Sequence, residues 1–262
     1  EGVTFSLKGK DIRVKAFEPL SVKLQERDTV ANVVGRKDER TYLRHVWQQL
    51  EEGGQSSCVI IEGEAGVGKT VLVESFIDEL AHEAGQDAFE FRRAFLKNSP
   101  RLLNVLELAA KKGQWGRTLE LGVHQGIAVH KSFNSYAAQL VEIKIVGNEV
   151  KVLKVVCAID CGLVVNPDIV TMQMESGIIF GITAALYGEI TYKDGQVQQS
   201  NFHDYPILRM NQSPEIETII VASKESPTGV GEPGVPPVAP AIANAMFKAT
   251  GKRYRRLPLK LV

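Results

Sequence analysis

Hydrophobic residues recur along the chain with two different spacings. Short apolar or alternating runs, typical of β-strands, occur at residues 1–20, 127–130, 136–146, 150–159 and 216–221. Two-residue turn sequences, Gly147-Asn148 and Asp194-Gly195, predict hairpins between strands. The pattern therefore predicts β-structure at both ends and in the middle of the chain.

The second spacing, with apolar residues three or four positions apart, is that of one face of an α-helix. It occurs from Gly35, from Leu72, in residues 87–112, where Pro100 divides two short helices, from Asn166 to about Leu186, and from Pro237 to Thr250. Asn166-Pro167-Asp168 is a helix start, and Gly251 is typical of a helix C-cap. Residues 113–126 are expected to form a loop. Together, the two spacings predict a mosaic of α+β and α/β structure.

Composition indicates a folded, soluble protein. Of the 262 residues, 44% are hydrophobic and 24% are charged, and the formal net charge is zero. This balance favours neither nucleic acid nor an anionic membrane as a partner. No apolar run approaches the roughly 20 residues of a spanning helix, and there is no signal-peptide pattern, so we expect a cytoplasmic location. The three cysteines form neither a disulfide framework nor a zinc site.

A phosphate-binding motif lies in the first third of the chain. The sequence GEAGVGKT follows a short apolar run, 58–61, that predicts a buried strand, and a helix is expected after it. In such a loop the glycines Gly63, Gly66 and Gly68 allow backbone amides to surround phosphates. Lys69 would neutralise their charge, and the Thr70 hydroxyl would be a ligand of Mg²⁺. The motif predicts ATP binding with magnesium.

A working ATPase of this class also needs a second strand that ends in an acid. The one apolar run that ends in aspartate is residues 155–160, which would make Asp160 the missing acid. A single-domain ATPase is therefore an alternative interpretation of the chain.

A second candidate site is the loop SPTGVGEPGVPP, which precedes the last predicted helix and contains Glu232. Glycine permits close approach of the backbone to a ligand, and proline fixes φ, so the loop can be tight and stiff. A carboxylate on such a loop, with its pKa tuned by burial, suits a general base. An exposed glutamate in a Gly/Pro turn is the structural alternative.

Several motifs in one order resemble the molybdopterin-binding subunit of the xanthine dehydrogenase/aldehyde oxidase superfamily, with the isoquinoline 1-oxidoreductase large (beta) subunits as the most similar branch. The resemblance spans about residues 87–259. It is carried by CAIDCGLVVNPD (157–168), QMESGIIFGITAALYGEI (173–190), SNFHDYPILRM (200–210) and GVGEPG (229–234).

The resemblance implies a function for several residues. Glu232 corresponds to the family's catalytic base, and Gly177, Phe180, Gly181 and Gly231 correspond to contacts of the cofactor. The cofactor would be molybdopterin, plain or in its cytosine dinucleotide form, with no protein side chain bound to molybdenum. Electrons would leave through a [2Fe–2S] partner subunit. The reaction would be oxidation or hydroxylation of a small N-heteroaromatic compound or an aldehyde.

The N-terminal part resembles a different family. The sequence FSLKGKDIRVKAFEPL is similar to the tail of a class III adenylate/guanylate cyclase domain, and the P-loop block resembles the ATPase module that follows such domains. The chain is therefore interpreted as a fusion of cyclase-tail-like strands (1–20), a partial P-loop segment (21–86) and a mixed α+β molybdopterin-binding-like domain (87–262).

Two functions of different classes follow. The first is a molybdenum hydroxylase-type oxidoreductase subunit, which we expect to be incomplete as an isolated chain. The second is an ATP-binding signalling module of a cyclase-like protein, and an inactive remnant is a third interpretation.

The intact phosphate loop predicts weak ATP or ADP binding, and the lack of a recognisable second acid predicts no appreciable hydrolysis. Lys69→Ala should abolish the binding because it removes the charge that meets the phosphates. An ATP-dependent thermal shift of the purified chain measures this. Turnover that disappears in Asp160→Asn would contradict the prediction and support the single-domain ATPase.

Overall fold

The computed structural model describes residues 3–6, 13–16 and 69–261, and the chain divides into two compact units, Glu1–Val34 and Gly35–Val262. In the first unit, strands β1 (Val3–Ser6) and β2 (Arg13–Ala16) pair antiparallel, which confirms the hairpin predicted for residues 1–20. The predicted helix from Gly35, the strand at 58–61 and the glycines of the phosphate loop lie outside the described residues.

The second unit is built on a four-stranded sheet with the order β3-β4-β5-β8. Its strands are β3 (Val123–Ser132), β4 (Ser135–Val146), β5 (Glu149–Asp160) and β8 (Glu215–Ile220). The first three strands form an antiparallel meander, whereas β8 runs parallel to β5. A parallel pair needs a long crossover, which here contains a helix and the small hairpin of β6 (Tyr192–Lys193) and β7 (Gln196–Val197).

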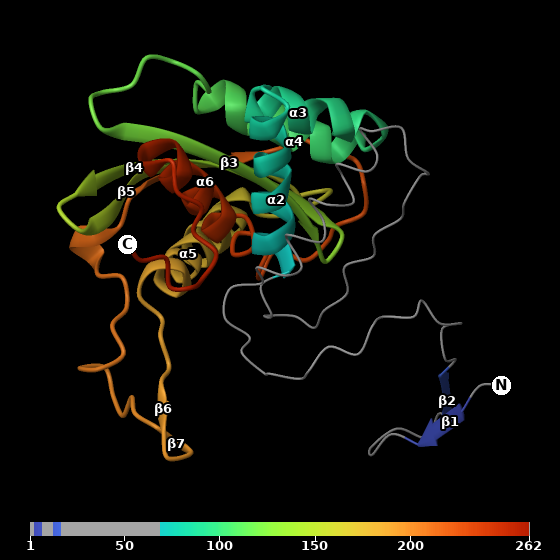
Figure 1. The fold of residues 1–262 in the computed structure, drawn as a ribbon. Coiled ribbons are helices and arrows are strands. Elements are labelled where there is room, and N and C mark those ends of the chain that lie inside the picture. Colours follow the sequence, from blue (N-terminus) through green and yellow to red (C-terminus); the bar gives the residue numbers. More distant parts are fainter. Residues whose placement is uncertain (1–2, 7–12, 17–68, 262) are drawn as a thin grey trace, which may run out of the picture. The chain divides into compact units, whose positions relative to one another are not determined.

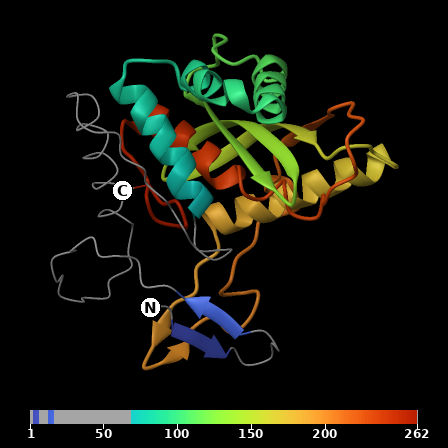
Figure 2. The ribbon, with the colours of Figure 1, turned by 90° about the vertical axis from the view of Figure 1, so that its right-hand side faces the viewer.

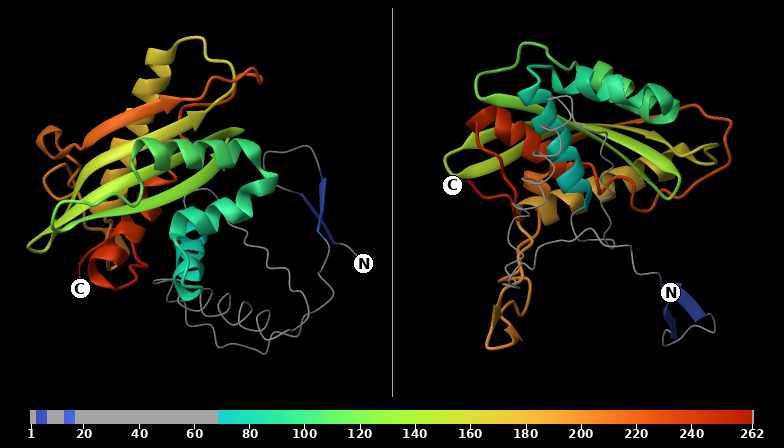
Figure 3. Two further views of the ribbon diagram at one scale, coloured as in Figure 1. Left: turned by 90° about the horizontal axis from the view of Figure 1, so that it is seen from above. Right: turned by 45° about the vertical axis from the view of Figure 1, so that its right-hand side comes forward.

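Helices cover both faces of this sheet (Figure 1). They are α2 (Lys69–Glu83), α3 (Ala88–Phe95), α4 (Pro100–Lys112), α5 (Pro167–Leu186) and α6 (Val238–Thr250). Short 3-10 turns lie at Leu96–Asn98 and Met210–Gln212. Helix α4 packs on one face, and α5 and α6 lie on the other, as the right-hand view shows (Figure 3).

Two hydrophobic cores fill the layers on the two faces of the sheet, and a smaller cluster joins Ala81 of α2 to Ala88 and Phe91 of α3. Alternate residues of the strands point to opposite faces, so Ala128 joins the core under α5 and α6 while its neighbours Ile127 and Val129 join the core under α4. Both cores contain residues with no exposed surface, including Val105 and Ile182.

Most predicted elements and their end signals are confirmed. Asn166 caps α5 by accepting hydrogen bonds from the amides of Asp168 and Ile169, and Gly251 has a φ of 70° after α6. The expected loop at 113–126 is wrong in its last part, because β3 already begins at Val123. The loop was expected to end at Gly126, but this glycine lies inside the strand. Its lack of a side chain permits close packing there and does not form a turn.

That packing is with α6. A Cβ atom on Gly126 would lie 2.1 Å from the carbonyl oxygen of Ala241 and 2.5 Å from the amide nitrogen of Ala245. The buried amide of Asn244 also donates to the carbonyl of Ile127 over 3.2 Å. Helix α6 therefore rests directly on the backbone of β3.

Helix α2 is confirmed, but the face that it buries differs from the apolar face expected from the sequence. Val73, Phe76, Ile77 and Leu80 are only partly buried. The buried residues include the polar residues Glu74, Ser75, Asp78 and Glu79. Helix α2 packs against α6, α3 and β3 (Figure 2), and its acidic face meets arginines. Ionic contacts therefore hold this helix, together with a small apolar cluster in which Ala81 is buried and Ile77 and Leu80 are partly buried.

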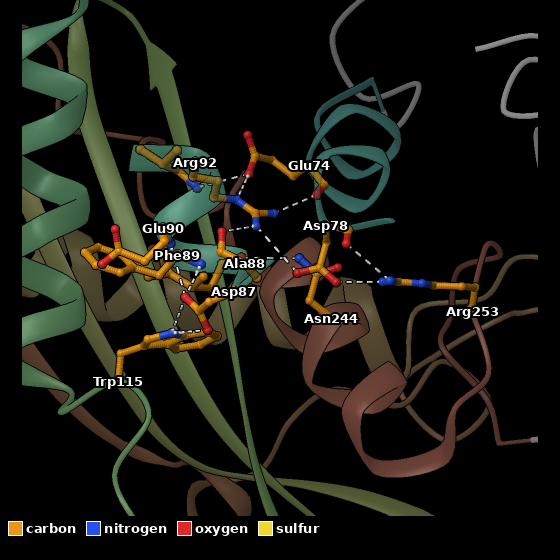
Figure 4. A network of polar contacts seen from close by, with 12 residues as sticks. Glu74, Asp78, Asp87, Ala88, Phe89, Glu90, Arg92, Trp115, Asn244 and Arg253 are labelled. Carbon is orange, nitrogen blue, oxygen red and sulfur yellow. Dashed lines mark hydrogen bonds and ion pairs between the residues drawn. The ribbon is translucent and has the colours of Figure 1, made fainter. Parts of the chain in front are cut away.

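The arginines come from α3 and from the segment after α6 (Figure 4). Arg92, itself buried, donates to a carboxylate oxygen of Glu74 at 3.2 Å and to the carbonyl of Glu74 at 2.8 Å. Arg253 donates to Asp78 at 2.7 Å. Burial raises the pKa of Glu74, and the neighbouring Arg92 opposes that rise. These bonds fasten α2 to the rest of the second unit.

Helix α5 departs from the expectation that no apolar run reaches the length of a membrane span. Among the residues that the structure describes, it alone meets that length and apolarity, with a mean hydropathy of 1.5. A core helix passes the same test, and Met174, Ile178 and Ile182 of α5 are fully buried in the domain.

A partly buried ion pair ties α4 to the end of β5. Arg101 donates to both carboxylate oxygens of Asp160, at 2.7 and 2.6 Å, and also lies over the ring of Tyr136. The hydrogen bond from Arg101 and the amide of Gly162 hold the pKa of Asp160 below its usual value, although burial opposes them. Asp160 therefore has a structural role at this sheet edge.

The contact at Gly126 gives a testable prediction. Gly126→Ala should destabilise the domain by about 3 kcal/mol or more, because the helix backbone cannot give way as a side chain can. Urea unfolding followed by circular dichroism measures this. Gly231→Ala is the matched control, since an added Cβ there meets no atom within 4 Å, and it should stay within about 1 kcal/mol. Equal stability of the two variants would show that α6 does not rest on β3.

The Arg101–Asp160 ion pair gives a second testable prediction. Asp160→Asn should cost about 1.5–3 kcal/mol at neutral pH, the usual worth of hydrogen bonds to charged groups. Because the folded-state pKa of Asp160 is lowered, its stabilisation is present above the unfolded-state pKa of about 3.9 and disappears as pH falls through the lower folded value. The difference between variant and parent should therefore shrink below about pH 4.

Denaturant titrations at pH 7, 5 and 3 test this prediction. Glu215→Gln is the control, because its pair with Lys154 also involves β5 but Glu215 is 69% exposed, so the change should cost less than about 1 kcal/mol. A loss for Asp160→Asn that stays constant down to pH 3 would contradict the assignment.

Candidate active site at the Glu232 loop

Glu232 lies in the segment that connects β8 to α6, shortly before the first residue of the helix. Its carbonyl accepts a hydrogen bond from the amide of Val235 at 2.8 Å, which closes a tight turn. The side chain is exposed, so the burial expected for a base with a tuned pKa is not observed in the described part of the chain.

Two polar side chains of β4 donate hydrogen bonds to the backbone of this loop. The hydroxyl of Ser135 donates to the carbonyl of Gly229 at 2.7 Å. The amide of Gln139 donates to the carbonyl of Gly234, also at 2.7 Å. Both side chains are fully buried. The loop is thus fixed to the sheet on both sides of Glu232.

The segment after β5 runs beside the start of the same loop. Thr228 donates its amide to the carbonyl of Cys161 at 2.9 Å, and Leu163 donates to the carbonyl of Glu225 at 2.8 Å. Gly162 has a φ of +76°, and a Cβ there would lie 2.1 Å from the carbonyl oxygen of Ser226. Two motifs that are distant in sequence, CAIDCG and SPTGVGEPG, are therefore in backbone contact.

Helix α5 forms the next wall. A Cβ on Gly177 would lie 3.4 Å from Cα of Gly234, and one on Gly181 would lie 3.1 Å from the side chain of Val238. The structure therefore brings two of the four predicted cofactor residues, Gly177 and Gly181, next to the Glu232 loop. The close approach that these two glycines permit is to the protein itself.

The outer side of the site is open. Gly231 has no atom within 4 Å of an added Cβ, and Phe180 is 66% exposed on α5. Ser176 is exposed on the same helix. The open backbone at Gly231 and the exposed ring of Phe180 leave room for an extended ligand such as molybdopterin, whereas Gly177 and Gly181 contact the protein and fit a supporting role.

The residues predicted to bind nucleotide are not brought to this site by anything the structure describes. Lys69 and Thr70 are the first residues of α2, and Gly63, Gly66 and Gly68 lie outside the described ranges. Asp160, the alternative magnesium ligand, has both oxygens bonded to Arg101, so its charge is already neutralised. This geometry disfavours the single-domain ATPase.

Two other features lie apart from this site. An open pocket of about 770 Å³ is lined by the start of β5, the end of α5 and residues 211–214 and 259–261, and no predicted site residue lines it. Within residues 3–6, 13–16 and 69–261, no three His, Cys, Asp or Glu side chains gather as metal ligands. Cys157 is buried, and burial raises the pKa of its thiol to about 12.

Sequence reasoning missed Ser135 and Gln139. A signal was present, because glutamine interrupts the apolar face of the strand predicted at 136–146, at a position where a core residue is expected. What could not be read from the sequence is the partner, the carbonyl of a glycine in a distant loop.

Comparison with known proteins agrees with this architecture. Residues 76–214, more than half of the chain, match the molybdopterin cofactor-binding domain. The chain is 38% identical to the beta chain of the isoquinoline 1-oxidoreductase of Brevundimonas diminuta, over 71% of this chain and 25% of that protein. It is 31% identical to one subunit of the nicotinate dehydrogenase of Pseudomonas putida, over 76% of this chain and 18% of that one.

The fold has a relative among solved structures. The aldehyde oxidoreductase of Desulfovibrio desulfuricans superposes with a TM-score of 0.57 at 16% identity, over 74% of this chain and 40% of that chain. The present chain spans about a quarter of the length of the first of these relatives. From the matched domain, the chain belongs to the molybdopterin cofactor-binding domain family of the xanthine dehydrogenase and aldehyde oxidase enzymes.

Proposed function

We propose that the chain is part of a molybdenum hydroxylase-type oxidoreductase that oxidises or hydroxylates a small N-heteroaromatic compound or an aldehyde. The observation that supports this most is the geometry of the Glu232 loop, in which an exposed carboxylate is held on a turn fixed to the sheet on both sides. The names of the relatives, an isoquinoline oxidoreductase and a nicotinate dehydrogenase, favour an N-heteroaromatic substrate.

In this proposal, molybdopterin lies along the outer side of the loop, where the backbone of Gly231 and the ring of Phe180 would contact it. Gly177 and Gly181 would act from beneath, by letting the loop lie close to α5. When bound, the cofactor supplies the two-electron redox chemistry. The cytosine dinucleotide form is a further part of the proposal.

Glu232 is proposed as the general base, which accepts a proton at its carboxylate during hydroxylation of the substrate. A base must lie within hydrogen-bond reach of the proton that it accepts, and a stiff loop limits the search for that geometry. Pro233 and Gly234, which follow Glu232 in the turn, are buried, whereas Glu232 itself is free to meet a substrate.

The remaining machinery is also proposed. The matched relatives are named as subunits, and we propose a [2Fe–2S] protein as the partner that receives the electrons. The segments 1–20, 21–86 and 87–262 remain the proposed organisation of the chain. The contacts of α2 with α6 and a family match that begins at residue 76 favour a junction nearer the N-terminus than residue 86.

Nucleotide binding is a second candidate function. The observation that favours it is that Lys69 and Thr70 are helical, as residues that follow the glycines of a phosphate loop should be. The Lys69→Ala experiment tests it separately from the oxidoreductase.

The proposed base predicts the effect of Glu232→Gln. In the assembled enzyme, with its cofactor and iron–sulfur partner, the variant should keep its molybdenum content and lose roughly 10²–10⁴-fold in turnover, the usual contribution of general-base catalysis. Metal analysis and steady-state kinetics with an N-heteroaromatic substrate measure the two quantities.

Glu225→Gln is the matched control, because Glu225 is an exposed glutamate of the same connecting segment and should be dispensable for turnover. If Glu232→Gln retained its molybdenum and a near-normal rate, Glu232 would be a turn residue only, and the proposal would lose its main support.

A further inference from the structure

We infer that Ser135 and Gln139 are positioning residues, which fix the position and orientation of the Glu232 turn relative to the sheet. The inference deepens the proposed function and rests on it for its catalytic meaning. Its structural part, that two strand side chains brace the turn, stands on the contacts alone.

The two residues lie on the same face of β4. They are four residues apart, and successive strand residues alternate between faces, so both point to the face that carries α5 and α6. Ala137 between them faces the same core. Strand β4 lies second in the sheet, paired on both edges, and is therefore a rigid base for a brace.

Each side chain holds one end of the turn. Ser135 has a single hydroxyl proton, which it donates to the carbonyl of Gly229, so the 2.7 Å contact with Thr228 is a bond donated by the Thr228 hydroxyl. Gln139 donates to the carbonyl of Gly234 at the other end. The two acceptor carbonyls bracket Val230–Pro233, the stretch that carries Glu232.

Gln139 has little else to bond. Its carboxamide oxygen is buried and has no hydrogen-bond partner among the described residues. Its nitrogen lies 3.9 Å from the sulfur of Cys157, a neutral thiol and a weak acceptor. A half-satisfied buried amide stabilises a fold poorly, so its bond to Gly234 contributes geometry more than stability.

The glycines explain why a brace is required. Gly234 packs against α5, where an added Cβ would lie 3.0 Å from the carbonyl of Met174, and Gly229 packs against Phe133, with 3.2 Å to its Cβ. Gly231 between them has no such neighbour. The turn is thus confined at its ends and open at its centre. The hydrogen bonds from Ser135 and Gln139 therefore determine the position of that centre.

Amide hydrogen exchange, followed by NMR on the whole chain, tests the brace without any cofactor. In Gln139→Leu, the Val235 amide, which closes the turn onto Glu232, should exchange at least about tenfold faster than in the parent. In Ser135→Ala, the Thr228 amide should respond in the same way. Amides of α6 beyond its first turn should not change in either variant.

Gln125→Leu is the matched control. Gln125 is also a buried strand glutamine that donates to a glycine carbonyl, that of Gly113 at 3.0 Å, but it holds a different loop. Its replacement should speed exchange at Gly116, whose amide donates to Gln125 at 3.1 Å, and leave Val235 unchanged. Unchanged Val235 exchange in Gln139→Leu and unchanged Thr228 exchange in Ser135→Ala would overturn the inference.

The assembled enzyme separates this inference from the proposed function. A positioning role predicts that Gln139→Leu lowers kcat at least about tenfold with little change in KM and with molybdenum retained, whereas Gln125→Leu keeps kcat. If Glu232→Gln abolishes turnover while Gln139→Leu keeps a normal kcat, the positioning role is refuted. If exchange responds as expected but Glu232→Gln is active, the brace stands and the proposed function fails. Should Gln139→Leu not fold, Ser135→Ala carries both measurements.

Discussion

The contact of helix α6 with the backbone of β3 sets the positions of the elements around it. At Gly126 the two backbones approach too closely for any side chain. Once α6 is fixed there, the segment before it must cross β4 to reach the helix, which places Gly229 and Gly234 over Ser135 and Gln139. Helix α5 then approaches the loop closely at Met174, Gly177 and Gly181. The candidate site is therefore a consequence of helix packing.

The features that could be predicted from the sequence depend on residues that are close together along the chain. Asn166, Gly147-Asn148 and Gly251 act through their own backbone or their nearest neighbours, so the elements that they delimit were predicted. The Glu232 loop was also found from sequence, because its glycines and prolines mark it. Its exposure was not foreseen, since burial depends on what packs around a loop.

The parts that were missed depend on contacts between distant residues. Gly126 looked like a loop residue because a glycine that admits a helix and a glycine that makes a turn are identical in sequence. In α2, the apolar spacing predicted only part of the buried surface, because Arg92 and Arg253 lie far along the chain from the acids that they pair with. The parallel pairing of β8 with β5 has no local signal either.

The ionic attachment of α2 has a consequence for how the domain responds to denaturants. The slope of unfolding against urea and the heat capacity of unfolding both grow with the apolar surface that becomes exposed. Detachment of α2 would expose carboxylates and guanidinium groups together with only a small apolar cluster, Ala81, Ala88 and Phe91, whereas the other helices cover larger apolar cores. Its opening would therefore contribute less to either quantity than the loss of the two large hydrophobic cores, and urea or calorimetric transitions would report mainly on those cores.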